Sequence, residues 1–267
     1  MPKYYNQEKV DLFRQTRIVA LKEYPFDPKH NSNTLYSYEK SRKEYLELKE
    51  KKKLLQFSNT TIRVVNEDTI DFTKSITRYA EGPILVLNLA SDYMPGGGCR
   101  SGCLAQEEQL YYCTGYDVIL GKHNRDQYYP LKHPEAESIL TTGVPVLRSG
   151  KYQFLEKSFR TDFLALPALR RPSLENGRYK SKDRETMRKK IESIFLIAAA
   201  RKYKTLVLGA LGCGAYHNPV DEVVKIYQEM ILKYKMHFDN ISFAVLAKNS
   251  KNPNFLEFTK LEKLNSK

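Results

Sequence analysis

The stretch that decides the fold is Ile84-Leu-Val-Leu-Asn-Leu-Ala90, which runs directly into Ser91-Asp-Tyr-Met-Pro-Gly96-Gly97-Gly98. The first part is a short apolar run closed by turn-forming residues, and this pattern predicts a buried β-strand. The glycines that follow permit a tight turn whose backbone N–H groups can face an anion. In open α/β sheets, ligands bind beyond the carboxyl ends of the strands, so this loop is a candidate binding element.

Strands and helices alternate on both sides of this stretch. Residues 61–67 alternate between apolar and polar side chains, and three further short apolar runs predict strands, at 163–167, 205–211 and 240–248. Helices are expected over residues 104–113, 184–203 and 254–264, and another is expected from Pro219 onward. This alternation predicts a three-layer α/β/α domain around a mixed central sheet.

The first 58 residues have a different character. They read as helical pieces broken at Pro25 and Pro28, with leucines interleaved among charged residues. We therefore expect residues 1–58 to form an N-terminal helical extension and residues 59–267 to form the main α/β domain.

Length and composition exclude several classes of protein. A chain of 267 residues, 41% of them hydrophobic, can bury a core without disulfide or metal staples. It has no apolar run near the roughly 18–20 residues that a membrane span requires, and its start lacks the order of a secretory signal. The spacing of its four cysteines fits no common metal site, so we expect reduced thiols and no metal. We expect a monomer in the cytoplasm, or in the nucleus if the source is eukaryotic, without membrane association.

The formal net charge of +13 is concentrated in two segments. Residues 1–60 carry 13 Lys/Arg against 8 Asp/Glu, and residues 170–204 carry 12 against 4. Local excess of this kind is typical of proteins that bind a polyanion, such as a nucleic acid. It is equally typical of a solvated, lysine-rich surface, and the charge alone leaves both interpretations open.

Two further motifs accompany the first glycine loop. A second glycine-rich loop, Gly209-Ala-Leu-Gly212-Cys-Gly214-Ala-Tyr216, follows the predicted strand that begins at Thr205. Gln106-Glu107-Glu108 opens the helix just after the triple glycine. Adjacent helical residues point about 100° apart, so both carboxylates can serve one site only if the helix begins there. Alone, the glutamates would be acids that complement a helix N-terminus.

The combination resembles the signature of the poly(ADP-ribose) glycohydrolases, a branch of the macrodomain superfamily, with the bacterial type closest. The resemblance rests on Gly96-Gly97-Gly98 followed by Gln106-Glu107-Glu108, and on the second loop with its closing aromatic residue, Tyr216. Asp68 stands in a segment that resembles the one contacting adenine, and Asn88 lies at the end of the strand before the triple glycine. The resemblance covers about residues 60–250 and implies a macrodomain-like fold.

The resemblance also implies an activity and a role for each motif. Hydrolysis of a ribose–ribose O-glycosidic bond needs an acid for the departing oxygen and then a base for water. Glu108 is implied as this acid/base, Glu107 as the residue that holds the scissile ribose, and Gln106 as the residue that positions the glutamates. Backbone donors of Gly96–Gly98 and Gly212–Ala215 are expected to bind the diphosphate, and Tyr216 to pack on the nucleotide. The implied loop residues also include Gly209, Leu211, Cys213 and Gly214.

The implied ligands are ADP-ribose and poly(ADP-ribose), with ADP-ribosylated proteins as partners and with no cofactor or metal. Three alternatives stay open at this point. The chain could remove single ADP-ribose groups from proteins or nucleic acids, or bind ADP-ribose without cleaving it. It could also bind nucleic acid through its excess positive charge.

Overall fold

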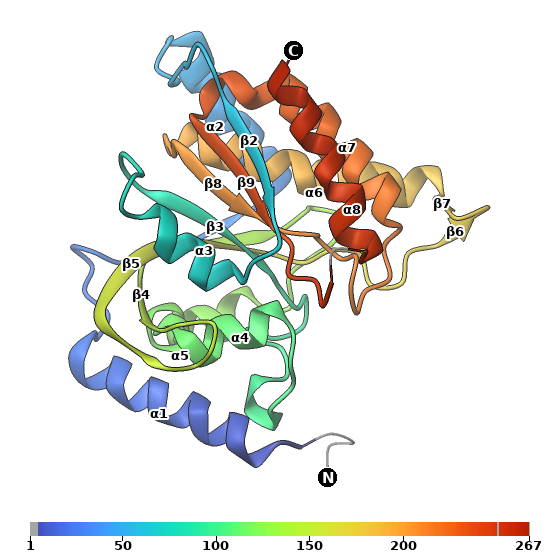
Figure 1. Cartoon of the computed structure of the whole chain (residues 1–267). Helices are drawn as coiled ribbons and strands as arrows, with labels where there is room; N and C mark the ends of the chain where they lie inside the picture. Colours follow the sequence, from blue (N-terminus) through green and yellow to red (C-terminus); the bar gives the residue numbers. More distant parts are fainter. Residues whose placement is uncertain (1–4, 250, 267) are drawn as a thin grey trace.

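A seven-stranded mixed sheet with helices on both faces forms the centre of the protein (Figure 1). The computed structural model describes residues 5–249 and 251–266. The strands run in the order β1-β4-β5-β3-β8-β9-β2 across the sheet. Their bounds are β1 Asn33–Tyr36, β2 Thr61–Val65, β3 Ile84–Leu89, β4 Ser138–Arg148, β5 Phe154–Leu166, β8 Thr205–Leu208 and β9 Asn240–Ala244. β6 (Leu174–Glu175) and β7 (Arg178–Tyr179) form a separate small hairpin.

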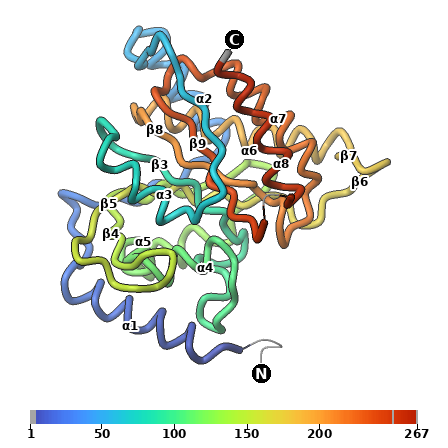
Figure 2. Tube along the Cα trace, in the orientation of Figure 1, coloured from blue at the N-terminus to red at the C-terminus, as the bar shows by residue number. Residues whose placement is uncertain are grey.

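The helices divide into two layers, one on each face of the sheet. One layer contains α2 (Tyr38–Glu50), α6 (Ser181–Ala200), α7 (Val220–Tyr234) and α8 (Pro253–Thr259). The other contains α1 (Gln7–Glu23), α3 (Thr69–Ile76), α4 (Gln106–Cys113) and α5 (Tyr116–Tyr128). Short 3₁₀ helices lie at η1 Cys99–Ser101, η2 Lys235–His237 and η3 Lys260–Ser266. The tube in Figure 2 shows α1 and α5 on the opposite side of the sheet from α7 and α8. The predicted three-layer architecture is confirmed.

Strand β3 lies in the middle of the sheet and is covered by helices on both faces. Leu85 and Leu87 pack into the core beneath α6 and α7, whereas Ile84 and Val86 pack into the core beneath α4 and α5. A strand covered on both faces reads as a continuous apolar run, which is the pattern that predicts it. β3 pairs in parallel with β5 on one side and with β8 on the other. The loops after β3 and β8 therefore leave the same edge of the sheet side by side.

Several elements were not expected from the sequence, among them helix α3 and the β6–β7 hairpin. Residues 33–36, which fall among the expected helical pieces, form edge strand β1 and pair antiparallel with β4. The long strand β4 pairs antiparallel with β5, which makes the sheet mixed. The segment between the first glycine loop and β4 contains the additional helix α5. The boundary predicted after residue 58 stays a prediction.

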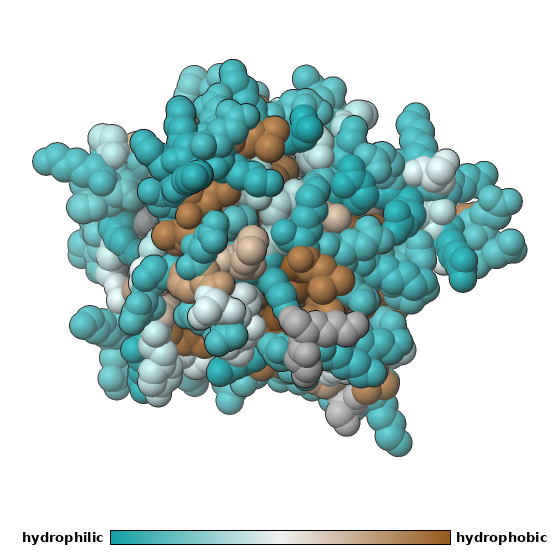
Figure 3. Space-filling model, turned by 90° about the horizontal axis from the view of Figure 1, so that it is seen from above, coloured by the Kyte–Doolittle hydropathy of each residue, from teal (hydrophilic) through white to brown (hydrophobic). Residues whose placement is uncertain are grey.

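Two further findings concern the hydropathy of the helices and of the surface. None of the described helices is long and apolar enough to cross a membrane. On the face drawn in Figure 3, hydrophilic side chains predominate, and hydrophobic ones gather in small groups between them.

Candidate active site

The first glycine loop is folded back against the start of α4. Gly96 and Gly97 both have positive φ, of 77° and 49°. A Cβ atom added to Gly97 would lie 2.5 Å from Oε1 of Glu108, and one added to Gly96 would lie 2.6 Å from the ring of Tyr111. These positions need glycine both for their backbone conformation and for this close approach.

Glu107 is the more buried of the two glutamates, with 3% of its surface exposed. Its Oε2 accepts the backbone N–H of Ser91 at 2.7 Å, and its Oε1 accepts that of Gly96 at 3.1 Å and the Nδ2 of Asn88 at 3.3 Å. Burial raises the pKa of Glu107 to about 8, against the opposing effect of these donors. Burial therefore favours the protonated form of Glu107.

Glu108 lies beside it, with 8% of its surface exposed. Its Oε1 accepts the backbone N–H of Gly98 at 2.8 Å. Because α4 begins at Gln106, after Ala105 in extended conformation, both glutamates sit in the first helical turn and reach the same loop. They line one cavity of about 300 Å³, which meets the condition that the sequence set for a shared site.

The hydrogen bonds of the triple glycine correct one expectation. Its three N–H groups were expected to bind a diphosphate. Those of Gly96 and Gly98 instead hold the two glutamates, and that of Gly97 donates to the carbonyl of Met94 at 3.2 Å. The physical reason is that buried carboxylates require donors, and this loop is the nearest source of them.

Gln106 ties α4 to the central strand. Its Oε1 accepts the N–H of Leu89 at 2.9 Å, and its Nε2 donates to the carbonyl of Leu87 at 2.8 Å. The side chain thus occupies backbone groups at the end of β3, and it fixes where the helix that carries the glutamates begins.

The second glycine loop presents unused backbone donors. The N–H groups of Leu211 and Cys213 bond to carbonyls within the loop. Within residues 5–249 and 251–266, those of Gly214, Ala215 and Tyr216 have no acceptor. These three residues line a cavity of about 170 Å³ together with Gln106 and Ala210. Successive free N–H groups in a turn form an anion-binding concavity.

Other predicted loop residues shape this turn from behind. Gly212 has φ +76°. The side chain of Asn218 packs against it, and its Nδ2 donates to the Gly212 carbonyl at 3.1 Å. The side chain of Leu211 is fully buried in the core, and Sγ of Cys213 donates to the Leu211 carbonyl. The carbonyl of Gly209 accepts from the hydroxyl of buried Tyr227 at 3.4 Å.

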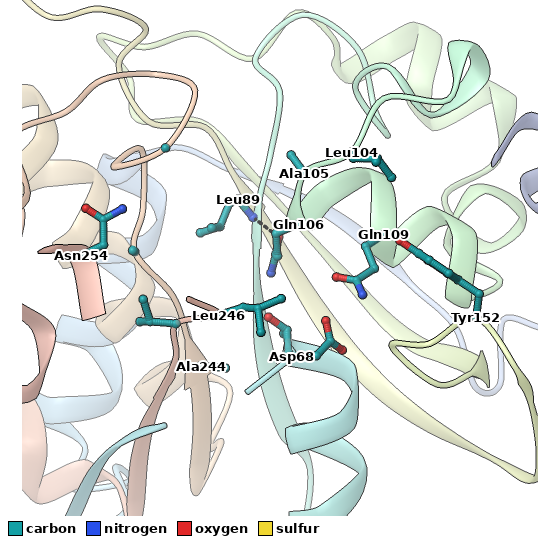
Figure 4. A pocket seen from close by; sticks show the side chains of 14 residues that line it. Asp68, Leu89, Leu104, Ala105, Gln106, Gln109, Tyr152, Ala244, Leu246 and Asn254 are labelled. Carbon is teal, nitrogen blue, oxygen red and sulfur yellow. Dashed lines mark hydrogen bonds between the residues drawn. The ribbon is translucent and has the colours of Figure 1, made fainter. Parts of the chain in front are cut away.

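A third cavity, of about 420 Å³, contains Asp68 (Figure 4). Oδ1 of Asp68 accepts the N–H groups of Ile70 and Asp71 and so caps α3, and burial raises the pKa of this carboxyl. Figure 4 shows Gln106 near the centre, between Asn254 on one side and Tyr152 on the other. Residues here that the sequence analysis missed are Gln109, Tyr152, Leu246 and Asn254. Of these, only Gln109 could have been predicted from the sequence, because it follows Gln106 by three residues and so shares its helix face.

The three cavities form one groove along the carboxyl ends of β9, β8 and β3. All three are lined by Leu89 and Ala105, and Tyr216 lines the two that contain the glutamates and the second loop. Tyr216 lies at the glutamate end rather than in the Asp68 cavity. The groove thus offers a polar pocket at one end, anion donors in the middle and a roomy pocket at the other.

Metal chemistry has no evident donor set in the part of the chain that the structure describes. No group of three or more His, Cys, Asp or Glu side chains there could hold a metal ion. The four cysteines are free thiols.

Comparisons with known proteins agree with this fold. A family model described as "Microbial-type PARG, catalytic domain" matches residues 7–149. The poly(ADP-ribose) glycohydrolase (PARG) structure from Thermomonospora curvata has 24% identity and a TM-score of 0.82, covering 96% of this chain and 100% of that one. A Deinococcus radiodurans PARG structure in complex with ADP-ribose has 23% identity and a TM-score of 0.73, covering 94% and 98%. No curated protein matches the sequence.

Proposed function

The chain belongs to the family of microbial-type PARG catalytic domains and is a glycohydrolase of poly(ADP-ribose), and we propose that Glu108 is its general acid/base. The observation that carries this proposal is the pair of buried glutamates, held by the first glycine loop in one cavity at the end of the groove. The family was expected from the sequence, and the family match confirms it.

We place ADP-ribose along the groove in one direction. The three free N–H groups at Gly214, Ala215 and Tyr216 suit the diphosphate. The adenine then occupies the cavity that contains Asp68, and the distal ribose lies between the glutamates and Tyr216. A Deinococcus radiodurans relative has been solved in complex with ADP-ribose, and a Thermomonospora curvata relative bound to the inhibitor ADP-HPD.

The reaction has two proton transfers: one to the departing oxygen and one from the attacking water. Glu108 donates a proton to the 2′-oxygen of the departing adenosine as the bond to C1″ of the distal ribose breaks through an oxocarbenium-like transition state. The Glu108 carboxylate then takes a proton from the water that attacks C1″. Burial favours the protonated form of Glu107, and in that form it can donate to a ribose hydroxyl and hold the sugar in place.

Further proposals concern the setting of the reaction. We propose ADP-ribosylated proteins as the carriers of the polymer and a monomer as the working state. The free thiols of the described residues suit a reducing compartment such as the cytoplasm.

The experiment that tests the role of Glu108 is ADP-ribose release from purified poly(ADP-ribose). Glu108→Gln is expected to lower kcat by about 100-fold or more, because a general acid/base contributes on that scale, while the Kd for ADP-ribose changes little. Glu81→Gln is the control, since the Glu81 side chain is 86% exposed. Unchanged turnover in Glu108→Gln would contradict the assignment. Release from single adducts but not from polymer would contradict the substrate class.

A further inference from the structure

One wall of the glutamate cavity is not used in the proposed binding of a single ADP-ribose unit. Tyr93 and Met94 line this cavity, and both are large apolar side chains that remain exposed, at 69% and 43%. Single exposed apolar residues are normal on protein surfaces. Here two consecutive ones stand at the mouth of the pocket in which we place the scissile bond.

Hydrogen bonds hold the backbone of the segment that carries these side chains. Oγ of Ser91 accepts the backbone N–H groups of Tyr93 and Met94 at 3.2 and 3.4 Å. The carbonyl of Asp92 accepts the N–H of Leu131 at 2.8 Å. Because the loop is already ordered, a ligand that binds there loses little free energy in ordering it.

Arg170 lies at the mouth of the same cavity, which we call its rim. Nη2 of Arg170 donates to Oδ1 of Asp92 at 3.1 Å and to the hydroxyl of Tyr216 at 3.2 Å, and its guanidinium lies 4.9 Å from the Tyr216 ring centroid. The other carboxylate oxygen of Asp92 bonds Nε2 of His133 at 3.0 Å. These contacts fix Arg170 through one nitrogen only. Its Nη1 and Nε have no hydrogen-bond acceptor among the described residues, and its side chain is 56% exposed.

The chemistry of the polymer identifies what belongs at this rim. The oxygen that leaves the distal ribose is the 2′-oxygen of the next unit's adenosine. That unit carries an adenine and a 5′-diphosphate, so a flat aromatic base and an anion leave together through the mouth of the glutamate cavity. An exposed tyrosine provides a stacking surface for a base, and an arginine with free N–H groups binds phosphate oxygens.

We propose that Tyr93, Met94 and Arg170 form a subsite for the leaving unit of the polymer, with its adenine on Tyr93 and its diphosphate at Arg170. This inference rests on the proposed function, because it requires the scissile ribose to lie at Glu107 and Glu108. The subsite makes the enzyme prefer a polymer end over a single ADP-ribose group on a protein. Its ligand class is an adenosine 5′-diphosphate substituted at its 2′-oxygen.

Binding of one unit and of two units separates this subsite from the rest of the groove. The probes are ADP-ribose and its 2′→1″-linked dimer, both measured with Glu108→Gln so that the dimer stays intact. The dimer is expected to bind about tenfold more tightly than ADP-ribose, the scale of one base stacked on an aromatic ring. Adding Tyr93→Ala is expected to remove most of this difference and leave the Kd of ADP-ribose unchanged.

Matched variants sharpen the result. Tyr93→Phe keeps the ring and should keep the tenfold difference. Tyr79→Ala removes a tyrosine that is 84% exposed, in a different cavity, and should have no effect on it. Arg170→Met, which keeps an aliphatic chain over Tyr216, should weaken binding of the dimer more than binding of ADP-ribose.

The outcomes distinguish two kinds of failure. Equal affinity for dimer and ADP-ribose in Glu108→Gln, or a difference that survives Tyr93→Ala, would overturn the subsite and leave the hydrolase assignment intact. No measurable binding of ADP-ribose, together with no polymer hydrolysis by the wild type, would overturn the proposed function and the subsite with it.

Discussion

Glu107 shows how burial changes the chemistry of one residue. Its carboxyl accepts two backbone N–H groups and lies next to a second buried glutamate. Desolvation dominates and raises its pKa from the ordinary value of 4.5 to about 8. The folded protein therefore keeps this proton at pH values where the unfolded chain has lost it.

This linkage makes stability depend on pH. The contribution of Glu107 to the free energy of unfolding is fully present below about pH 4.5 and is lost as pH rises through about 8. Glu107→Gln has no proton to lose, so its Tm should fall less between pH 5 and pH 8.5 than that of the wild type. Thermal unfolding of both proteins across this range checks the slope. Parallel curves would show that Glu107 ionises normally in the folded state.

At the scale of elements, the first glycine loop and α4 act as one unit. The loop supplies the donors that hold both glutamates, and the helix supplies the glutamates that fill the loop. Gly97 lies at the contact between them. It has φ +49°, and a Cβ added there would come within 2.5 Å of Glu108.

Gly97→Ala should therefore move Glu108 and lower polymer hydrolysis by about 100-fold, the scale on which a displaced catalytic group acts. The control is Gly177→Ala, because Gly177 also has positive φ, of 75°, but a Cβ added there meets nothing within 4 Å. Both variants place a side chain at a positive φ, but only the one at Gly97 also brings a Cβ against Glu108. Steady-state kinetics on poly(ADP-ribose) gives the comparison, and equal losses would assign the effect to strain.

Helix α6 carries a buried cation on its core face. Lys190 is fully buried, and among the described residues its Nζ has no hydrogen-bond partner. Burial lowers the pKa of this amine to about 7. Below this pH both folded and unfolded states bind the proton, so the full cost of a buried charge opposes folding.

Lys190→Met should raise the Tm by several degrees, because it replaces this amine with an apolar chain of similar length. The gain should be larger at pH 6.5 than at pH 9, where the folded protein holds the amine neutral. Differential scanning calorimetry at the two pH values measures it. A lower Tm in the variant would mean that the amine has a stabilising partner.

At the scale of the whole molecule, the N-terminal segment is packed into the fold that holds the site. The backbone N–H of Asn6 bonds the carbonyl of Ser101 next to the first glycine loop. Thr16 of α1 is fully buried; its hydroxyl donates to the carbonyl of Tyr112 at 2.7 Å and accepts from Nε of Arg148 at 2.8 Å. α1 thus joins the helix that carries the glutamates to the strand β4.

Thr16→Val removes both hydrogen bonds and should lower the free energy of unfolding by about 1–3 kcal/mol, since it leaves buried polar groups unpaired. Thr77→Val is the control: Thr77 is the half-buried residue that follows α3, and its hydroxyl donates only to the carbonyl of Lys74 in the same helix. Urea unfolding should show one transition that shifts as a whole. An early, separate transition of the variant would indicate that α1 folds independently of the α4 layer.

The sequence by itself determined the local features of this protein. The apolar run at residues 84–90 predicted a buried strand, because a strand covered on both faces needs apolar side chains at every position. The order and spacing of Gly96–Gly98 and Gln106–Glu108 resemble the signature of the family, and this resemblance could be seen in the sequence alone. Both features are set by neighbours within about 25 residues along the chain.

Only the tertiary structure decided which residues far apart in the sequence are in contact. The pairing of β1 with β4 places residues 33–36 in the sheet, although their surroundings are helical. Arg170 reaches the glutamate cavity because the strand β5 that precedes it lies next to β3. Which N–H groups of the two glycine loops stay free depends on the acceptors that folding brings to them. Such contacts depend on the packing of the whole chain, so a local sequence pattern does not predict them.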